Sequence, residues 1–111
     1  MKKIIKLNDN DIFIYNLEIK YDFYANGFVI KNIFDINCVA LNIEILNSSI
    51  DTLDNKIYLK IKCKKILYDK LIKILFSYKN LATACAILIK NKKLYKKNIF
   101  KKIIKIFKGK N

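Results

Sequence analysis

Histidine, arginine, proline and tryptophan are all missing from this sequence of 111 residues. Without histidine, a Ser-His-Asp triad and any histidine-containing zinc site are excluded. The three cysteines, Cys38, Cys63 and Cys85, are odd in number and form no C-x-x-C pair. We therefore expect neither a disulfide framework nor a structural zinc site, and we expect no metal and no other cofactor.

Long apolar segments are lacking as well. No run approaches the ~18 apolar residues of a membrane span, and the start "MKKIIKLNDND" has no apolar core of a signal peptide. No stretch rich in Pro, Gly or Ser divides the chain. The sequence therefore predicts one domain over residues 1–111, in a reduced, cytoplasmic protein with no membrane span.

The charge that is present is unevenly distributed. The net charge is +14; residues 1–55 hold 5 lysines and 8 acids, whereas residues 56–111 hold 18 lysines and Asp69 as the one acid. This surplus favours a polyanionic partner. Because no arginine is available for bidentate contacts, sequence-specific base recognition is disfavoured, while non-specific attraction to phosphates is not. Phe, Tyr, Met, Ile, Asn and Lys make up 73 residues, which indicates AT-rich codon drift, so lysine content alone does not establish a function.

Apolar periodicity predicts an order of strand, helix and further strands. Alternation over 11–21 predicts a strand whose inward side chains cross a slip near Asn16: Ile12, Ile14, Leu17, Ile19 and Tyr21. A turn is expected at "ANG", residues 25–27. From 29 to 47 apolar residues occupy most faces of a helical repeat, which indicates an enclosed helix.

The second half is expected to contain mainly strands. "KIYLKIKCKK", residues 56–65, alternates apolar residues with Lys60, Lys62 and Lys64. Residues 69–78 and 81–91 are interpreted as two more strands, and 94–108 fits an amphipathic helix or a final strand equally well. This order predicts an α+β domain in which an antiparallel sheet is wrapped around one central helix. A double-stranded-RNA-binding layout and a basic α+β domain of no recognisable family are the competing interpretations.

Two segments resemble the hot-dog acyl-CoA thioesterases, particularly the phenylacetyl-CoA thioesterase-like branch: "NGFVIKNIFD" and "DKLIKILFSYKNLATACAILIKNKKLYKK". In that branch a His-Gly-Gly turn opens the central helix, and an acid follows nine residues after the His. Here Asn26, Gly27 and Phe28 occupy the turn, and Asp35 has the spacing of the acid. The resemblance covers most of residues 12–100. The His and the second Gly are replaced, and a branch similar to 4-hydroxybenzoyl-CoA thioesterase has its acid where this chain has Tyr24.

The resemblance implies a hot-dog fold, a homodimer and hydrolysis of acyl-CoA or acyl carrier protein thioesters. Asp35 would be the catalytic base or nucleophile. The substrate-binding residues would be Asn26, Gly27 and Phe28, with backbone N–H groups aimed at the thioester oxygen from the helix N-terminus. The alternative for Asp35 is a solvent-facing carboxylate that the helix dipole stabilises.

Lys60, Lys62 and Lys64 are candidate phosphate contacts, for coenzyme A, an acidic acyl carrier protein or RNA. The alternative function is that of a basic, non-specific RNA-binding or ribosome-associated protein, with Tyr68 and Tyr78 as candidates for base stacking. A third hypothesis is a hot-dog relic that binds a ligand or partner without turnover. The orientation of the 29–47 helix separates the first two. A sheet that encloses this helix favours the thioesterase, whereas a helix lying on one face of an open sheet favours RNA binding.

Overall fold

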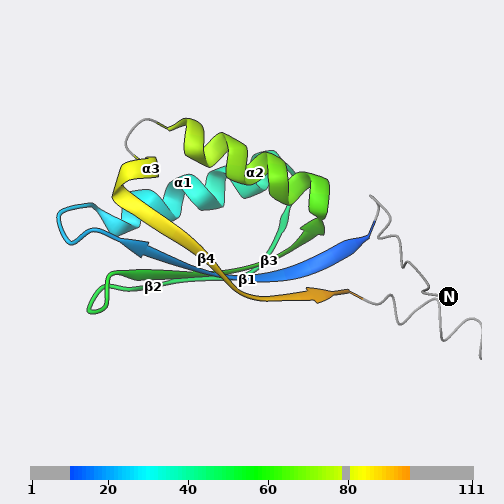
Figure 1. The fold of residues 1–111 in the computed structure, drawn as a ribbon, viewed down its shortest axis with the longest axis horizontal. Helices are drawn as coiled ribbons and strands as arrows, with labels where there is room; N and C mark the ends of the chain where they lie inside the picture. The colour runs from blue at the N-terminus through cyan, green and yellow to red at the C-terminus, as the bar shows by residue number, and fades with distance from the viewer. Residues whose placement is uncertain (1–10, 79–80, 96–111) are drawn as a thin grey trace, which may run out of the picture.

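A computed structural model of the chain describes residues 11–78 and 81–95, without the side chain of Ala82. The elements follow one another as β1 (Ile12–Tyr21), α1 (Gly27–Ala40), β2 (Glu44–Asp51), β3 (Lys56–Lys64), α2 (Lys65–Ser77), α3 (Leu81–Ala84) and β4 (Cys85–Leu94) (Figure 1). The four strands form one antiparallel sheet in the order β2-β3-β1-β4. The predicted α+β class with an antiparallel sheet is confirmed.

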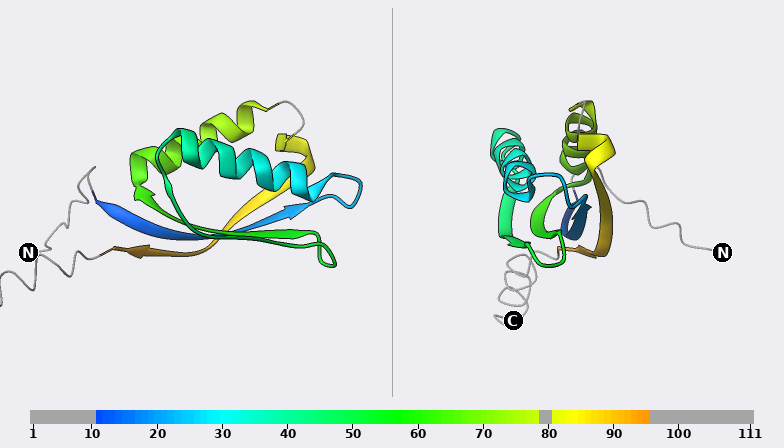
Figure 2. Two further views of the ribbon diagram at one scale, coloured as in Figure 1. Left: turned by 180° about the vertical axis from the view of Figure 1, so that it is seen from behind. Right: turned by 90° about the vertical axis from the view of Figure 1, so that its left-hand side faces the viewer.

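Both long helices lie on the same face of the sheet, as the end-on view in Figure 2 shows. Helix α1 connects β1 to β2, and α2 connects β3 to the short helix α3 and β4. With α3 set aside, this is the β-α-β-β-α-β order of the split βαβ, or ferredoxin-like, arrangement. Within the described ranges no helix covers the other face of the sheet, which we call the open face.

The core lies between the sheet and the two helices. Alternate side chains of the two central strands point toward the helices, because successive residues of a strand face opposite sides. The buried residues of this layer are Phe13, Tyr15, Leu17, Ile19 and Tyr21 of β1, Ile57, Leu59, Ile61 and Cys63 of β3, Ile30, Phe34 and Cys38 of α1, and Leu71 and Leu75 of α2. Burying one such large aliphatic side chain contributes roughly 1.5–3 kcal/mol.

The first helix is shorter and less enclosed than predicted. It ends at Ala40, and Asn42 adopts a positive φ of 57°. The Asn42 N–H donates to the Val39 carbonyl and the Ile43 N–H to the Cys38 carbonyl, which is the Schellman arrangement that closes a helix. Residues 44–51 then form β2. Only one side of α1 is buried, since Val39 is 68% exposed, so the expectation of a helix enclosed on most sides is wrong for the single chain.

A second helix stands where strands were predicted. Residues 65–77 form α2, so the strand prediction for 69–78 is wrong. Leu71 and Leu75 are buried at helical spacing, and Leu67, Tyr68 and Ile72 pack against the core beside them. The strand prediction for 81–91 is correct from Cys85 onward, because 81–84 form α3. Most of the ambiguous segment 94–108 lies outside the described residues.

The slip predicted within β1 is also wrong. Alternation continues unbroken, so Phe13 and Tyr15 face the helices, while Ile12 and Ile14 are half-buried on the open face. The irregularities lie in the two edge strands. Asn16 pairs with Asn91 and Leu17 with Ile89, which leaves Lys90 as an extra residue in β4. Leu46 is the corresponding extra residue in β2.

Candidate functional site

The N-terminus of α1 is capped by the side chain of Asn26. Asn26 is the N-cap, and its Oδ1 accepts hydrogen bonds from Phe28 N–H (3.1 Å) and Val29 N–H (3.2 Å). A side-chain acceptor at this position satisfies N–H groups that the helix leaves unpaired. The Phe28 N–H, expected to face a thioester oxygen, is therefore already bonded in this structure.

Gly27 has a packing role. A Cβ atom at this position would lie 2.4 Å from Cζ and 2.5 Å from Oη of Tyr21, and 2.8 Å from Cδ1 of Ile50. The absence of a side chain lets the first turn of α1 approach the end of β1. Phe28, the next residue, points outward and is exposed.

Asp35 links α1 to the edge strand. One carboxylate oxygen accepts from Lys31 Nζ at 2.8 Å, one turn earlier, and the other accepts from Ser48 Oγ of β2 at 2.7 Å. The side chain is about three-quarters buried, at 24% exposure. Asp35 therefore connects α1 to β2 through Ser48 and forms an ion pair with Lys31 within α1.

An open groove along α1 brings part of the predicted site together. It has a volume of about 380 Å³, and Asn26, Phe28 and Asp35 line it together with Lys31 and Asn32. Gly27 instead lines a neighbouring hollow with Tyr21 and Asn55. The structure thus assembles an acid and polar groups on one surface, while Lys60, Lys62 and Lys64 lie on the opposite side of the sheet.

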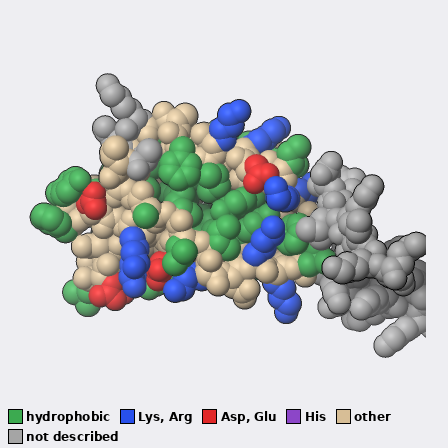
Figure 3. All heavy atoms as spheres, viewed as in Figure 1, with side chains coloured by type: hydrophobic (Ala, Val, Ile, Leu, Met, Phe, Trp, Pro, Cys, Tyr) green, Lys and Arg blue, Asp and Glu red, His purple; other side chains and the backbone are tan. Residues whose placement is uncertain are grey.

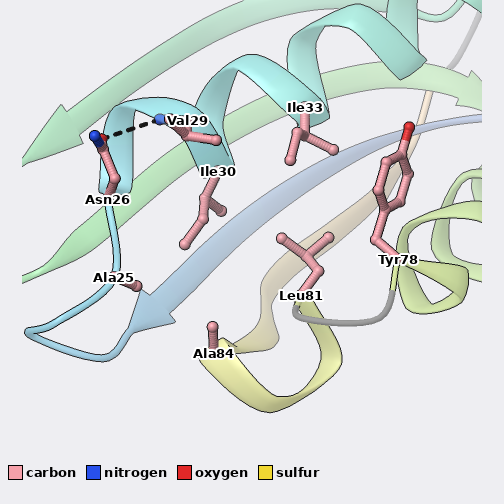
Figure 4. A pocket seen from close by; sticks show the side chains of 8 residues that line it. All are labelled: Ala25, Asn26, Val29, Ile30, Ile33, Tyr78, Leu81 and Ala84. Atoms are coloured by element: carbon pink, nitrogen blue, oxygen red, sulfur yellow. Dashed lines mark hydrogen bonds between the residues drawn. The ribbon is translucent and has the colours of Figure 1, made fainter.

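A more apolar pocket lies on the other flank of α1. Figure 4 shows its lining from the β1–α1 loop, α1, the end of α2 and α3: Ala25, Asn26, Val29, Ile30, Ile33, Tyr78, Leu81 and Ala84. Its volume is about 360 Å³. The only polar side chains that line it are Asn26, which caps α1, and Tyr78, whose hydroxyl accepts from Asn37 Nδ2 at 3.3 Å. None of the charged candidates lines this pocket.

Exposed apolar side chains mark one end of the molecule. Phe23 and Tyr24 stand on the β1–α1 loop and Leu53 on the β2–β3 turn. Both loops lie at the left end of the molecule in Figure 1, and hydrophobic side chains gather at that end in Figure 3. Acids lie in the same loops. The Tyr24 hydroxyl donates to Asp22 at 2.7 Å, which raises the pKa of Tyr24. Asp51 accepts backbone hydrogen bonds within the turn. This end does not favour phosphate groups.

The open face has the opposite character. On β3 the outward residues are Lys56, Tyr58, Lys60, Lys62 and Lys64, and cross-strand pairing places Lys20 of β1 and Lys93 of β4 on the same side. The acids on this face are Glu18, Glu44 and Asp51. Lys62 Nζ lies 3.7 Å from the centre of the Tyr95 ring, a cation–π contact. Lysines also project from the helix side in Figure 3, so the open face is distinguished by its pattern and not by charge alone.

Sequence reasoning missed two central residues of this face, Tyr58 and Glu18. Tyr58 is 37% exposed and lies directly opposite Glu18 in the register. The sequence does indicate the side on which Tyr58 lies, because it has the same parity as Lys60, Lys62 and Lys64. The tyrosines that were proposed for stacking lie elsewhere. Tyr68 packs in the core against Tyr15 (4.1 Å, nearly parallel rings), and Tyr78 borders the apolar pocket.

The thiols belong to the core. Burial, with a smaller contribution from Asp35, raises the pKa of Cys38 to about 12. Burial also raises the pKa of Cys63 to about 11. Both thiols are therefore protonated at neutral pH, and a protonated thiol is a poor nucleophile. Among the residues that the structure describes, no three His, Cys, Asp or Glu side chains are grouped to hold a metal ion.

Fold and surface together define an α+β domain of split βαβ order with a lysine-rich open sheet face. Comparisons of the chain with known protein families, with curated proteins and with solved structures find no match. No helix within residues 11–78 and 81–95 is long and apolar enough to cross a membrane.

Proposed function

We propose that this protein binds single-stranded RNA, without strict sequence specificity, on the open face of its sheet. The observation that carries the proposal is the outward side of β3, where Tyr58 stands in a row of four lysines. RNA-binding sheets bind single strands by stacking bases on exposed aromatic rings while basic residues contact the phosphates. Both chemical elements are present on this one strand.

The position of the row supports the proposal. Strand β3 lies between β2 and β1, so its outward side chains stand in the interior of the sheet surface. Lysines at every second residue repeat at about 6.7 Å along a strand, and Lys20 and Lys93 widen the basic area across β1 and β4. A flexible polyanion can follow such a surface, and both long helices lie on the other face.

The residue types favour non-specific binding. Stacking of one base on an aromatic side chain contributes about 1–3 kcal/mol and tolerates any base. Lysine attracts phosphates as a point charge, without the planar fork with which arginine binds two acceptors at once. The expected partner is therefore any accessible single strand, including unpaired regions of structured RNA such as ribosomal RNA.

Fluorescence anisotropy with a labelled 12-nucleotide single-stranded RNA at several salt concentrations tests the proposal. Removing one lysine that binds a phosphate should reduce the salt slope of log K by about 0.7. Lys60→Gln/Lys64→Gln should therefore reduce it by about 1.4. The matched control is Lys70→Gln/Lys73→Gln, which removes the same charge from exposed positions on α2. Equal reductions in both variants would contradict a site on the open face.

Tyr58 separates stacking from simple charge attraction. Tyr58→Ala should weaken binding to the single strand about tenfold and change binding to an RNA duplex much less, because duplex bases are not free to stack. If the wild type prefers the duplex and the variant binds both RNAs as well as the wild type does, the protein is a general polycation and the proposal fails.

Hydrolysis of acyl-CoA or acyl-carrier thioesters is the second candidate function, and the open groove along α1 is the observation that favours it. Asp35, Asn26 and Phe28 line one surface, as a catalytic acid and its substrate contacts would. The hot-dog fold and the homodimer that accompany this hypothesis remain proposals. The second helix on the sheet and the bonded Phe28 N–H weigh against it. Hydrolysis of acyl-CoA substrates that is abolished in Asp35→Asn would support it.

A further inference from the structure

Glu18 is unusual on the open face. It is the one charged or polar residue among the described residues that is buried, at 5% exposure, whereas the side chains of the two lysines nearest to it are 27% exposed (Lys56) and 56% exposed (Lys90). A buried carboxylate is unfavourable unless it is paired with donors. A negative group in the centre of a surface that attracts phosphates also opposes that attraction. A ligand group that offers hydrogen-bond donors would be favoured beside it.

The contacts of Glu18 leave its acceptor capacity available. Its carboxylate oxygens lie 3.5 Å from Lys56 Nζ and 3.9 Å from Lys90 Nζ. Charge-assisted hydrogen bonds are about 2.7–2.9 Å long, so these lysines neutralise the carboxylate without close bonding. Within the described part of the chain, Glu18 has no shorter polar partner. The two lysine side chains are long and flexible, and they can move to phosphates when a nucleic acid arrives.

The register places Glu18 beside the stacking residue. Glu18 of β1 pairs directly with Tyr58 of β3 on one side and with Leu88 of β4 on the other. Directly opposite residues have Cβ atoms about 4.5–5.5 Å apart. A base that stacks on the exposed Tyr58 ring therefore brings its edge over Glu18, and exposed Leu88 offers an apolar contact beyond it.

We infer that Glu18 makes the open face prefer single strands that contain guanine. The inference rests on the proposed function, and it names the base that is selected at the centre of the open face. Guanine presents two neighbouring donors, N1–H and N2–H, on its Watson–Crick edge, and a carboxylate accepts two parallel hydrogen bonds. Cytosine and adenine each offer only an exocyclic amine there. Uracil offers one N–H between two carbonyl oxygens, which the carboxylate repels.

Competition with single-guanine RNA tests the inference. Three nine-nucleotide RNAs are compared by anisotropy: nine uridines, the same strand with a central guanosine, and the same strand with a central inosine, which lacks the N2 amine. The wild type should bind the guanosine strand about tenfold more tightly than the uridine strand. The inosine strand should lie between them. This comparison needs no variant, so it does not depend on the folding of a mutant.

Glu18→Gln then assigns the preference to the carboxylate, and Glu44→Gln is the matched control. Glu44 is an exposed acid of the same face, opposite Lys62, and its substitution changes the charge equally. Both variants should bind the uridine strand slightly more tightly, and only Glu18→Gln should lose the guanosine preference. RNA binding without a preference in the wild type, or a preference that survives in Glu18→Gln, overturns the inference and leaves the proposed function standing. Absence of RNA binding overturns both.

Discussion

The two sides of β3 differ in both burial and charge. Toward the helices, the residues Ile57, Leu59, Ile61 and Cys63 are almost entirely buried. Toward the open face, lysines flank Tyr58, which is 37% exposed. One strand of nine residues therefore supplies both the core and the candidate binding surface. Substitutions of its inward residues should therefore lower the stability of the fold, and substitutions of its outward residues should lower the affinity for RNA.

The largest effect is expected where neighbouring residues of β3 are substituted in turn. Ile61→Ala removes a fully buried side chain and should lower the free energy of unfolding by about 3 kcal/mol. Lys60→Ala, one residue earlier on the open face, should change it by less than about 0.5 kcal/mol. Urea denaturation measures both. RNA affinity should respond in the opposite order, falling in Lys60→Ala and not in folded Ile61→Ala. Similar stability losses in the two variants would break the comparison.

The pH dependence of stability tests the buried side of the sheet, where Cys38 and Cys63 lie. Burial raises the pKa of Cys38 to about 12 and that of Cys63 to about 11, above the ordinary value of 9.0. The folded state keeps these protons when the unfolded state releases them. The stabilisation is therefore complete below pH 9 and is lost as the pH rises through the folded pKa values. The two thiols together should lower the free energy of unfolding by about 2 kcal/mol between pH 9 and pH 10.

Urea denaturation of the wild type and of Cys38→Ala/Cys63→Ala across this range is the measurement. The double variant starts less stable but should lose less stability with rising pH, because no buried thiol remains at these positions. Tyrosine titration contributes to both curves. Parallel curves would show that the thiols do not differ between the folded and unfolded states.

The outcome on β3 shows what alternation in a sequence can predict. Its inward and outward residues were assigned correctly, because charged and apolar side chains alternate without exception over 59–64. The same rule failed for the first half of β1, where Phe13, Ile14 and Tyr15 are all bulky and no polarity marks the sides. In its second half, Leu17, Ile19 and Tyr21 face the core as predicted. In the first half of β1 the pairing with neighbouring strands determines which side chains face the helices, and this pairing cannot be read from a single sequence.

The end of α1 and the presence of α2 could not be predicted from the spacing of apolar residues. Apolar residues continue at helical spacing past Ala40, but Asn42 takes the left-handed conformation that ends α1. In 65–77, apolar residues are dense enough to fit either period, and only packing of Leu71 and Leu75 on the sheet selects the helix. The candidate site on the open face was predicted only in part. The lysine row was identified, whereas Glu18 gained significance only through its register with Tyr58.

Gly27 gives a smaller effect on the helix side. Gly27→Ala places a Cβ against the buried Tyr21 ring, and relief of this overlap should cost about 1.5 kcal/mol. Thermal denaturation of Gly27→Ala, Tyr21→Leu and the double variant measures the coupling. The double variant should be more stable than the sum of the single effects predicts, since the smaller side chain makes room. Strict additivity would mean that the first turn of α1 shifts without strain.

The smallest effect is expected at Asp35, where the two candidate functions meet. Its carboxylate accepts from Ser48 Oγ of β2 and from Lys31 Nζ, and it is only partly buried. Asp35→Asn keeps the shape and an acceptor for Ser48 while it removes the ion pair, so the free energy of unfolding should fall by no more than about 1 kcal/mol. RNA affinity should not change, because α1 lies on the other side of the sheet from Lys60, Lys62 and Lys64. If the wild type hydrolyses acyl-CoA and Asp35→Asn loses at least about 10²-fold of that rate, then the groove along α1 is the active surface. Unchanged hydrolysis, or none in the wild type, leaves Asp35 as the residue that fastens α1 to the edge strand.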